Sequence, residues 1–190
     1  MIKTENLIIF VLFALVLNLS SCEPVGLPDI TETGENTFGM KVDGKDWIAS
    51  SSIGINYSPP ILSVQYYSIS RGLVISSYNE WRNESVTFYI PNVVGVGDYF
   101  FTCGYSLPDM SDADSTNNYC RTRFIKYNND DSPENNFVLY DKNESNMRIT
   151  KFDTINKIIS GTFSVNLYNS YGEKIEITDG RFEVELQIYP

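Results

Sequence analysis

The sequence predicts an all-β fold: a single antiparallel β-sandwich domain of about ten strands that follows a signal peptide and a flexible tether. Hydrophobic and polar residues alternate along most of the chain after Phe38, which is the period of strands with one buried face. Segments rich in Gly, Pro, Asn and Asp separate the alternating stretches. No stretch of ten or more residues after the signal has a helical period. A barrel is the alternative architecture.

Residues 1–21 form a predicted lipoprotein signal peptide. The apolar run 7–17 is shorter than the roughly 20 residues that a spanning helix needs, and it has the length of a secretory h-region. The residues that follow, Leu19-Ser20-Ser21-Cys22, resemble a bacterial lipobox. The resemblance implies that the Cys22 thiol carries a diacylglycerol and that the chain is cut before it. We therefore expect a lipid-anchored protein of the bacterial cell envelope, in the periplasmic or the surface leaflet of the outer membrane.

Residues 22–36 form a predicted flexible tether, because they are rich in Pro, Gly and acidic residues and have no hydrophobic period. About fifteen extended residues reach on the order of 50 Å. The predicted β-sandwich domain then covers residues 37–190, a suitable length for one domain.

The clearest strands are 157–167 and 181–189. In the second, Phe182 and Val184 alternate with Glu183 and Glu185, which we expect on a charged face open to solvent. The pairs Asp43-Gly44 and Asp179-Gly180 predict short hairpin turns. The other predicted strands are 37–42, 62–69, 72–78, 84–90, 98–103, 119–127, 137–140, 147–152 and 173–178.

Three elements carry a second resemblance. They are the segments 42–47 (VDGKDW), 159–163 (ISGTF) and 177–182 (ITDGRF). Together, in this order, they resemble a family of uncharacterised Bacteroidetes cell-envelope lipoproteins, in which Asn is common where this chain has Asp43. The resemblance implies an envelope location and a β fold, with no established activity. From the residues alone, we expect Trp47 to pin the first hairpin onto the core. Gly161 indicates a bulge or a close pass beneath an aromatic ring.

Cys103 and Cys120 are the cysteines that remain once Cys22 is lipidated. Two thiols in an oxidising compartment predict one disulfide, which would close the base of a polar insertion. The alternative is two separate buried thiols.

Composition excludes several function classes. The chain has 190 residues, no His and a formal net charge of −10. Without His there is no Ser-His-Asp or Cys-His catalysis and no His-ligated metal. The negative charge without a basic cluster excludes nucleic acid as a partner. No nucleotide or phosphate motif is present, and we predict no cofactor and no metal site.

A non-catalytic binding or structural module is therefore the predicted function. A surface glycan-binding accessory protein for polysaccharide capture is the alternative, with Trp81, Tyr78 and Asn79 as candidate ligand-binding residues in one loop. Trp and Tyr rings stack on sugar faces while polar neighbours bind the hydroxyl groups. The other candidate partner, an outer-membrane protein complex, would require an exposed apolar patch.

The sequence contains two further candidate sites. A glycoside hydrolase would need a carboxylate pair, and the candidates are Glu80 with Glu84 and Glu183 with Glu185; we predict no catalytic residues, because solvent-exposed pairs have no reason for a raised pKa. The Asp- and Asn-rich loops 109–118 and 128–131 could supply oxygen ligands for Ca²⁺. In the first loop the EF-hand spacing fails, because a motif that starts at Asp112 has Asn117 in place of Gly and Arg123 in place of Glu.

Overall fold

The computed structural model describes residues 26–50, 62–103, 120–129 and 133–190. These residues form a mixed sheet of eleven strands in the order β2-β1-β11-β3-β4-β5-β7-β8-β10-β9-β6. The strands are β1 (Thr37–Val42), β2 (Lys45–Ile48), β3 (Leu62–Tyr67), β4 (Gly72–Asn79), β5 (Glu84–Ile90), β6 (Gly97–Tyr99), β7 (Arg123–Tyr127), β8 (Pro133–Val138), β9 (Ser145–Asp153), β10 (Ile158–Tyr168) and β11 (Lys174–Tyr189), with a 3₁₀ helix, η2 (Lys142–Glu144), before β9.

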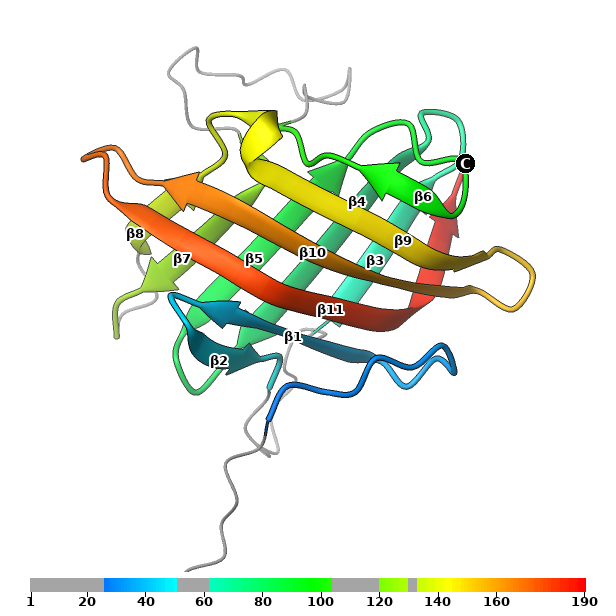
Figure 1. Ribbon diagram of the computed structural model, residues 1–190, viewed down its shortest axis with the longest axis horizontal. Helices are drawn as coiled ribbons and strands as arrows, with labels where there is room; N and C mark the ends of the chain where they lie inside the picture. The colour runs from blue at the N-terminus through cyan, green and yellow to red at the C-terminus, as the bar shows by residue number, and fades with distance from the viewer. Residues whose placement is uncertain (1–25, 51–61, 104–119, 130–132) are drawn as a thin grey trace, which may run out of the picture.

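The sheet folds into two layers, so the predicted all-β, sandwich-like fold is confirmed (Figure 1). One layer contains β2, β1, β11, β10, β9 and β6, and it lies across the other, which contains β3, β4, β5, β7 and β8. Hydrogen-bonded pairs also join the layers at two edges. The end of β11 runs parallel to β3 from Leu186 opposite Val64, and β10 reaches β8 at Tyr168 opposite Val138.

The strand β11 was predicted as two strands with a hairpin turn at Asp179-Gly180, and that prediction is wrong. Asp179 has φ 51°, but the chain continues in the same direction, and the pairing with both neighbours β1 and β10 shifts at this point. Asp179-Gly180 is therefore a bulge inside one strand of 16 residues. A bulge tolerates the same left-handed backbone as a hairpin turn, and it bends the strand instead of reversing it. The Asp43-Gly44 turn between β1 and β2 is a hairpin, as predicted.

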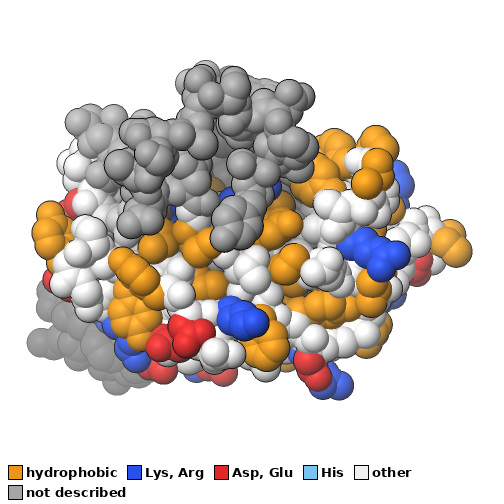
Figure 2. Space-filling model, turned by 90° about the horizontal axis from the view of Figure 1, so that it is seen from above, with side chains coloured by type: hydrophobic (Ala, Val, Ile, Leu, Met, Phe, Trp, Pro, Cys, Tyr) orange, Lys and Arg blue, Asp and Glu red, His pale blue; other side chains and the backbone are white. Residues whose placement is uncertain are grey.

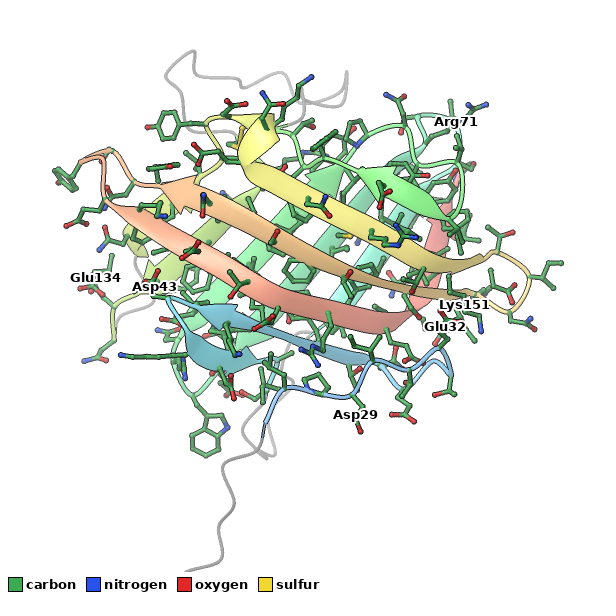
Figure 3. The ribbon with its side chains drawn as sticks, in the orientation of Figure 1. Asp29, Glu32, Asp43, Arg71, Glu134 and Lys151 are labelled. Carbon is green, nitrogen blue, oxygen red and sulfur yellow. A yellow bond between two sulfur atoms is a disulfide. The ribbon has the colours of Figure 1, made fainter. Side chains whose placement is uncertain are left out.

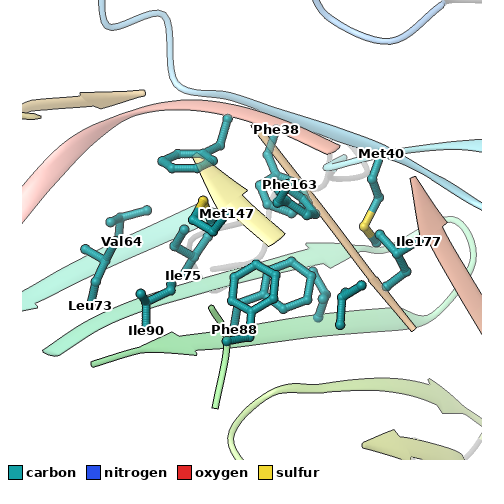
Figure 4. Close-up of a cluster of buried hydrophobic side chains, with 14 of the residues drawn as sticks. Phe38, Met40, Val64, Leu73, Ile75, Phe88, Ile90, Met147, Phe163 and Ile177 are labelled. Carbon is teal, nitrogen blue, oxygen red and sulfur yellow. The ribbon is translucent and has the colours of Figure 1, made fainter. Parts of the chain in front are cut away.

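The core lies between the two layers (Figure 4). Its centre is a set of aromatic rings from both layers, in which the Phe88 ring lies 4.6 Å from Phe101 and 4.9 Å from Phe163 between centroids. Phe38 extends the set, 5.4 Å from Phe163. Each ring is buried, and aromatic pairs at these separations contribute about 0.5–1.5 kcal/mol beyond the burial of their area.

Trp47 and Gly161 have the structural roles that the sequence predicts. Trp47 is fully buried, packs edge-on against Phe38, and donates its indole N–H to the Glu84 carboxylate at 2.9 Å. The β9–β10 pairing shifts at Gly161. A Cβ at this position would lie 2.6 Å from the Arg148 carbonyl oxygen and 2.8 Å from the Phe182 ring, so the close pass requires glycine.

A disulfide joins Cys103 to Cys120, with 4.1 Å between their Cα atoms, which confirms the predicted pair. Cys103 lies after β6 and Cys120 lies just before β7. The bridge closes the insertion 104–119, which is outside the described residues.

Residues 26–36, the described part of the predicted tether, run along β1 before the chain turns into that strand (Figure 3). Pro28 and Leu27 pack over Gly39, where a Cβ would lie 2.6 Å from Pro28 Cδ. Lys151 donates to the Glu32 carbonyl oxygen at 2.7 Å, and Figure 3 shows these two residues together at one end of the sheet. We call residues 27–36 the N-terminal strap.

Candidate functional site

The predicted ligand-binding residues were expected in one loop, but Tyr78 and Asn79 are the last residues of β4 and only Trp81 lies in the turn between β4 and β5. Trp81 has 76% of its surface exposed. Asn79 is buried, donates to the Ile48 carbonyl oxygen at 2.8 Å and accepts from the Arg82 amide at 2.9 Å. Tyr78 donates its hydroxyl proton to the Asn83 side chain. Tyr78 and Asn79 therefore brace the turn, and Trp81 is the exposed residue among the three candidates.

Three of the four candidate catalytic carboxylates, Glu84, Glu183 and Glu185, lie in different environments. Glu84 holds the indole N–H of Trp47, and Glu185 is exposed on β11. Glu183 was expected in open solvent, and that expectation is wrong, because the N-terminal strap covers its side chain and leaves 2% of the residue exposed.

Glu183 holds the N-terminal strap on the sheet. Its carboxylate accepts hydrogen bonds from the Thr31 hydroxyl and from the Gly34 and Glu35 amides. Burial by itself would raise the pKa of this carboxyl, but the donated hydrogen bonds outweigh it, so the pKa of Glu183 is lowered. The carboxylate is thus charged and hydrogen-bonded at neutral pH, and it has a structural role.

A shallow, open hollow of about 360 Å³ lies at the end of the molecule where β10 turns into β11. It is lined by two tyrosines, one acid and the small polar residues of the turn: Tyr140, Glu144, Tyr168, Asn169, Ser170 and Gly172. The Tyr140 and Tyr168 rings meet edge to face at 5.9 Å. Tyr140 has 69% of its surface exposed. We call this feature the tyrosine hollow.

Hydrogen bonds fix the polar side of the tyrosine hollow. The Tyr168 hydroxyl donates to Glu144 at 2.7 Å, and this hydrogen bond raises the pKa of Tyr168. Asn169 is buried and accepts from the Tyr171 and Glu173 amides at 3.0 and 2.9 Å, while its own amide donates to the Glu173 carboxylate at 2.6 Å. The turn beside the rings is therefore ordered before any ligand arrives.

Such a hollow can hold one face of a small amphipathic ring. The tyrosine faces supply apolar contact, and the Glu144 carboxylate, the Ser170 hydroxyl and the tyrosine hydroxyls supply hydrogen bonds. Sequence reasoning missed this site. Tyr140 follows β8 and Tyr171 lies in the β10–β11 turn, where it is 86% exposed, so loop-borne tyrosines were the available signal. The convergence of Tyr140 and Tyr168 with Glu144 depends on a β8–β10 contact that the sequence does not show.

A second exposed feature is an apolar rim at the end where the β3–β4 turn, the 91–96 loop and the end of β11 meet. The Ser68 amide donates to Tyr189 O at 2.8 Å, and the Val93 amide donates to Arg71 O at 2.7 Å, so the three segments are joined. The exposed members of the apolar rim are Ile69, Val94, Val96, Ile188 and Tyr189. Figure 2, which views the molecule from above, shows hydrophobic side chains gathered on its right side.

Metal-binding clusters and membrane-spanning helices can be described only for residues 26–50, 62–103, 120–129 and 133–190. Within them there is no group of three or more His, Cys, Asp and Glu side chains that could hold a metal ion. The acidic positions 109–118 and 130–131 lie outside these ranges. Among the same residues, no helix is long and apolar enough to cross a membrane.

Comparison with known proteins finds no matching family model, no matching curated protein and no matching solved structure.

Proposed function

We propose that this chain is a bacterial envelope lipoprotein, anchored by lipid on Cys22, whose β domain is a non-catalytic binding module. The lipobox-like Leu19-Ser20-Ser21-Cys22 supports the anchor, although it lies outside the described residues. The tyrosine hollow supports the binding role, and a carbohydrate is the ligand class that its chemistry fits best.

The single observation that carries the carbohydrate proposal is the pair Tyr140 and Tyr168 beside Glu144. An exposed aromatic face next to a fixed carboxylate complements a sugar ring, which has apolar C–H faces and a rim of hydroxyl groups. The hollow is open and shallow, as a chain-like glycan requires, because neighbouring sugar units must extend beyond the site.

The sugar test compares two aromatic surfaces of the same protein. An array of bacterial and plant polysaccharides is probed with the mature chain and with the variants Tyr140→Ala and Trp81→Ala. The affinity for each polysaccharide that binds is then measured by calorimetry. We expect Tyr140→Ala to weaken binding at least about tenfold, which is about 1.4 kcal/mol, and Trp81→Ala to leave it unchanged. Unchanged affinity of Tyr140→Ala would exclude the tyrosine hollow as the binding site. Loss of binding in Trp81→Ala alone would show that the site is at the β4–β5 turn. Absence of any bound glycan would remove the ligand class.

The anchor test is independent of the ligand. Cells are given a radiolabelled or clickable fatty acid, and the parent chain is compared with Cys22→Ala. We expect Cys22→Ala to carry no fatty-acid label and to be absent from the membrane fraction. A Cys22→Ala chain that is acylated and fractionates like the parent would overturn the anchor.

Docking of a partner protein is the second candidate function, because the apolar rim is exposed. The matched variant is Val94→Asp with Val96→Asp, which changes two exposed side chains outside the strands. Loss of a cross-linked envelope complex in this variant, with the glycan array unchanged, would support a protein partner; a complex that survives it would exclude the rim as the docking surface.

A further inference from the structure

The strap changes the length of chain that separates the β domain from its lipid. An undocked tether of about fifteen residues would let the domain move on the order of 50 Å from the bilayer. The hydrogen bonds to Glu183 and Lys151, with the packing of Pro28 on Gly39, hold residues 27–36 against the domain. Four peptide units then separate Gly26 from Cys22, and they span at most about 14 Å.

The exit point of this short linker lies at the same end of the molecule as Trp81. Leu27 and Pro28 pack over Gly39, and Gly39 pairs with Ile48 on β2. The Ile48 carbonyl oxygen accepts from Asn79, the residue that braces the β4–β5 turn. Figure 1 shows both the start of the strap and the β4–β5 turn at the lower edge.

Trp81 is well placed for an interface at this edge. It is 76% exposed at the tip of a turn that Asn79 and Asn83 fix on two sides, through Ile48 O at 2.8 Å and Asn128 O at 2.8 Å. The adjacent Arg82 donates to the Asp46 carbonyl oxygen at 2.7 Å and is itself exposed. A Trp ring beside a cationic side chain is typical of the lipid headgroup region, because the indole is apolar with one polar N–H.

We propose that the β4–β5 turn is a bilayer contact, with Trp81 seated in the headgroup region beside the lipid on Cys22. This inference rests on the proposed anchor. The strap sets the distance, and the braced turn sets the orientation. The tyrosine hollow, at the β10–β11 turn, then lies away from the tip of the turn that meets the lipid, and remains open to the aqueous side.

The chain contains two tryptophans, and one of them, Trp47, is fully buried, which gives the test an internal reference. The mature lipidated chain is reconstituted into vesicles of phosphatidylethanolamine and phosphatidylglycerol, with or without phosphatidylcholine brominated near the headgroup end of its acyl chains. Acylation of each sample is measured by intact mass. We expect Trp81 emission to shift to the blue on reconstitution and to lose most of its intensity with brominated lipid. Trp81→Phe, which keeps Trp47 alone, should show neither change.

Each outcome separates the contact from the anchor. A chain without acyl mass fails the anchor proposal. The chain can instead be acylated and bound to vesicles while Trp81 emits at the wavelength of a water-exposed indole and is not quenched by brominated lipid. That result overturns the bilayer contact and leaves the lipid anchor supported. Quenching of Trp81 by an oligosaccharide without vesicles would also overturn it, because the ring would then belong to a sugar site.

Discussion

The Glu183 carboxylate on β11 accepts a hydrogen bond from the Thr31 hydroxyl, across 152 residues of chain. This contact joins the segment next to the proposed lipid anchor to the longest strand of the sheet. A sequence that resembles a linker is thereby part of the folded domain.

Replacing Glu183 should release the strap. Glu183→Gln removes the charge that three donors share, and hydrogen bonds to charged groups contribute about 1.5–3 kcal/mol. The Gln carbonyl oxygen can still accept from the Gly34 and Glu35 amides, but the Gln amide group cannot accept from the Thr31 hydroxyl. We therefore expect a loss of about 1–2 kcal/mol in the free energy of unfolding. The Gly34 and Glu35 amides should also exchange hydrogen faster. Glu185→Gln, an exposed change on the same strand, is the control, and equal exchange in the two variants would contradict the role of Glu183.

Acid should loosen the strap in the same way. The pKa of Glu183 is lowered in the folded protein, so the folded state binds fewer protons than the unfolded chain, whose Glu has a pKa of about 4.3. The stabilisation is complete above that value and is lost as the pH falls through the lowered pKa.

The same acid response can be isolated from other groups. The pKa values of Asp153 and Asp179 are also lowered, by hydrogen bonds from Asn156 and Lys41 respectively, so the parent is compared with Glu183→Gln across the pH range. We expect the stability difference between the two to shrink as the pH falls. A difference that stays constant down to the most acid pH would rule out the carboxylate as the titrating group.

The strands that the sequence predicted best are those with strict alternation and a turn at each end. The bounds 37–42 and 84–90 are those of β1 and β5, because one buried face dictates the period. The predicted turn at Asp179-Gly180 is wrong for a physical reason. A left-handed residue next to glycine is required both by a hairpin turn and by a bulge, and only the partner strands decide between them.

Gly180 should resist substitution. A Cβ there would overlap the Phe163 ring, which lies in the aromatic centre of the core. Overpacking of this kind costs about 1–3 kcal/mol, so Gly180→Ala should lower the midpoint of urea unfolding. Gly26→Ala, where a Cβ meets nothing within 4 Å, is the matched control. Equal midpoints for the two variants would show that the Phe163 ring moves aside without cost.

Loss of the disulfide should lower stability without changing the fold. The bridge joins residues 17 apart in sequence, and in the chain-entropy model a loop of this size contributes about 3 kcal/mol. Cys103→Ser with Cys120→Ser should therefore unfold at lower urea concentration, with far-ultraviolet circular dichroism preserved in buffer. A stability equal to that of the parent would mean that the reduced, unfolded chain is already restricted.

The candidate sites could be predicted only in part, because exposure can be inferred from sequence but convergence cannot. Trp81 in a polar turn was expected at the surface, and it is exposed. Asn79, two residues earlier, looked equally available but is buried by β2. Tyr140 and Tyr168 are 28 positions apart in the printed sequence and meet only because β10 reaches the edge of β8.

The pairing of β11 with β1, β10 and β3 has a kinetic consequence. The hairpins β1–β2 and β3–β4 can pair as soon as they are made. The pairings of β1, β10 and β3 with β11, which join the two layers along one edge, must wait until residues 174–189 are available. Domains with such distant pairings fold slowly, on the order of milliseconds to seconds, and an incomplete chain would expose the unpaired edges of both layers to other chains. A chaperone would therefore protect the chain from aggregation mainly before β11 has been synthesised and paired.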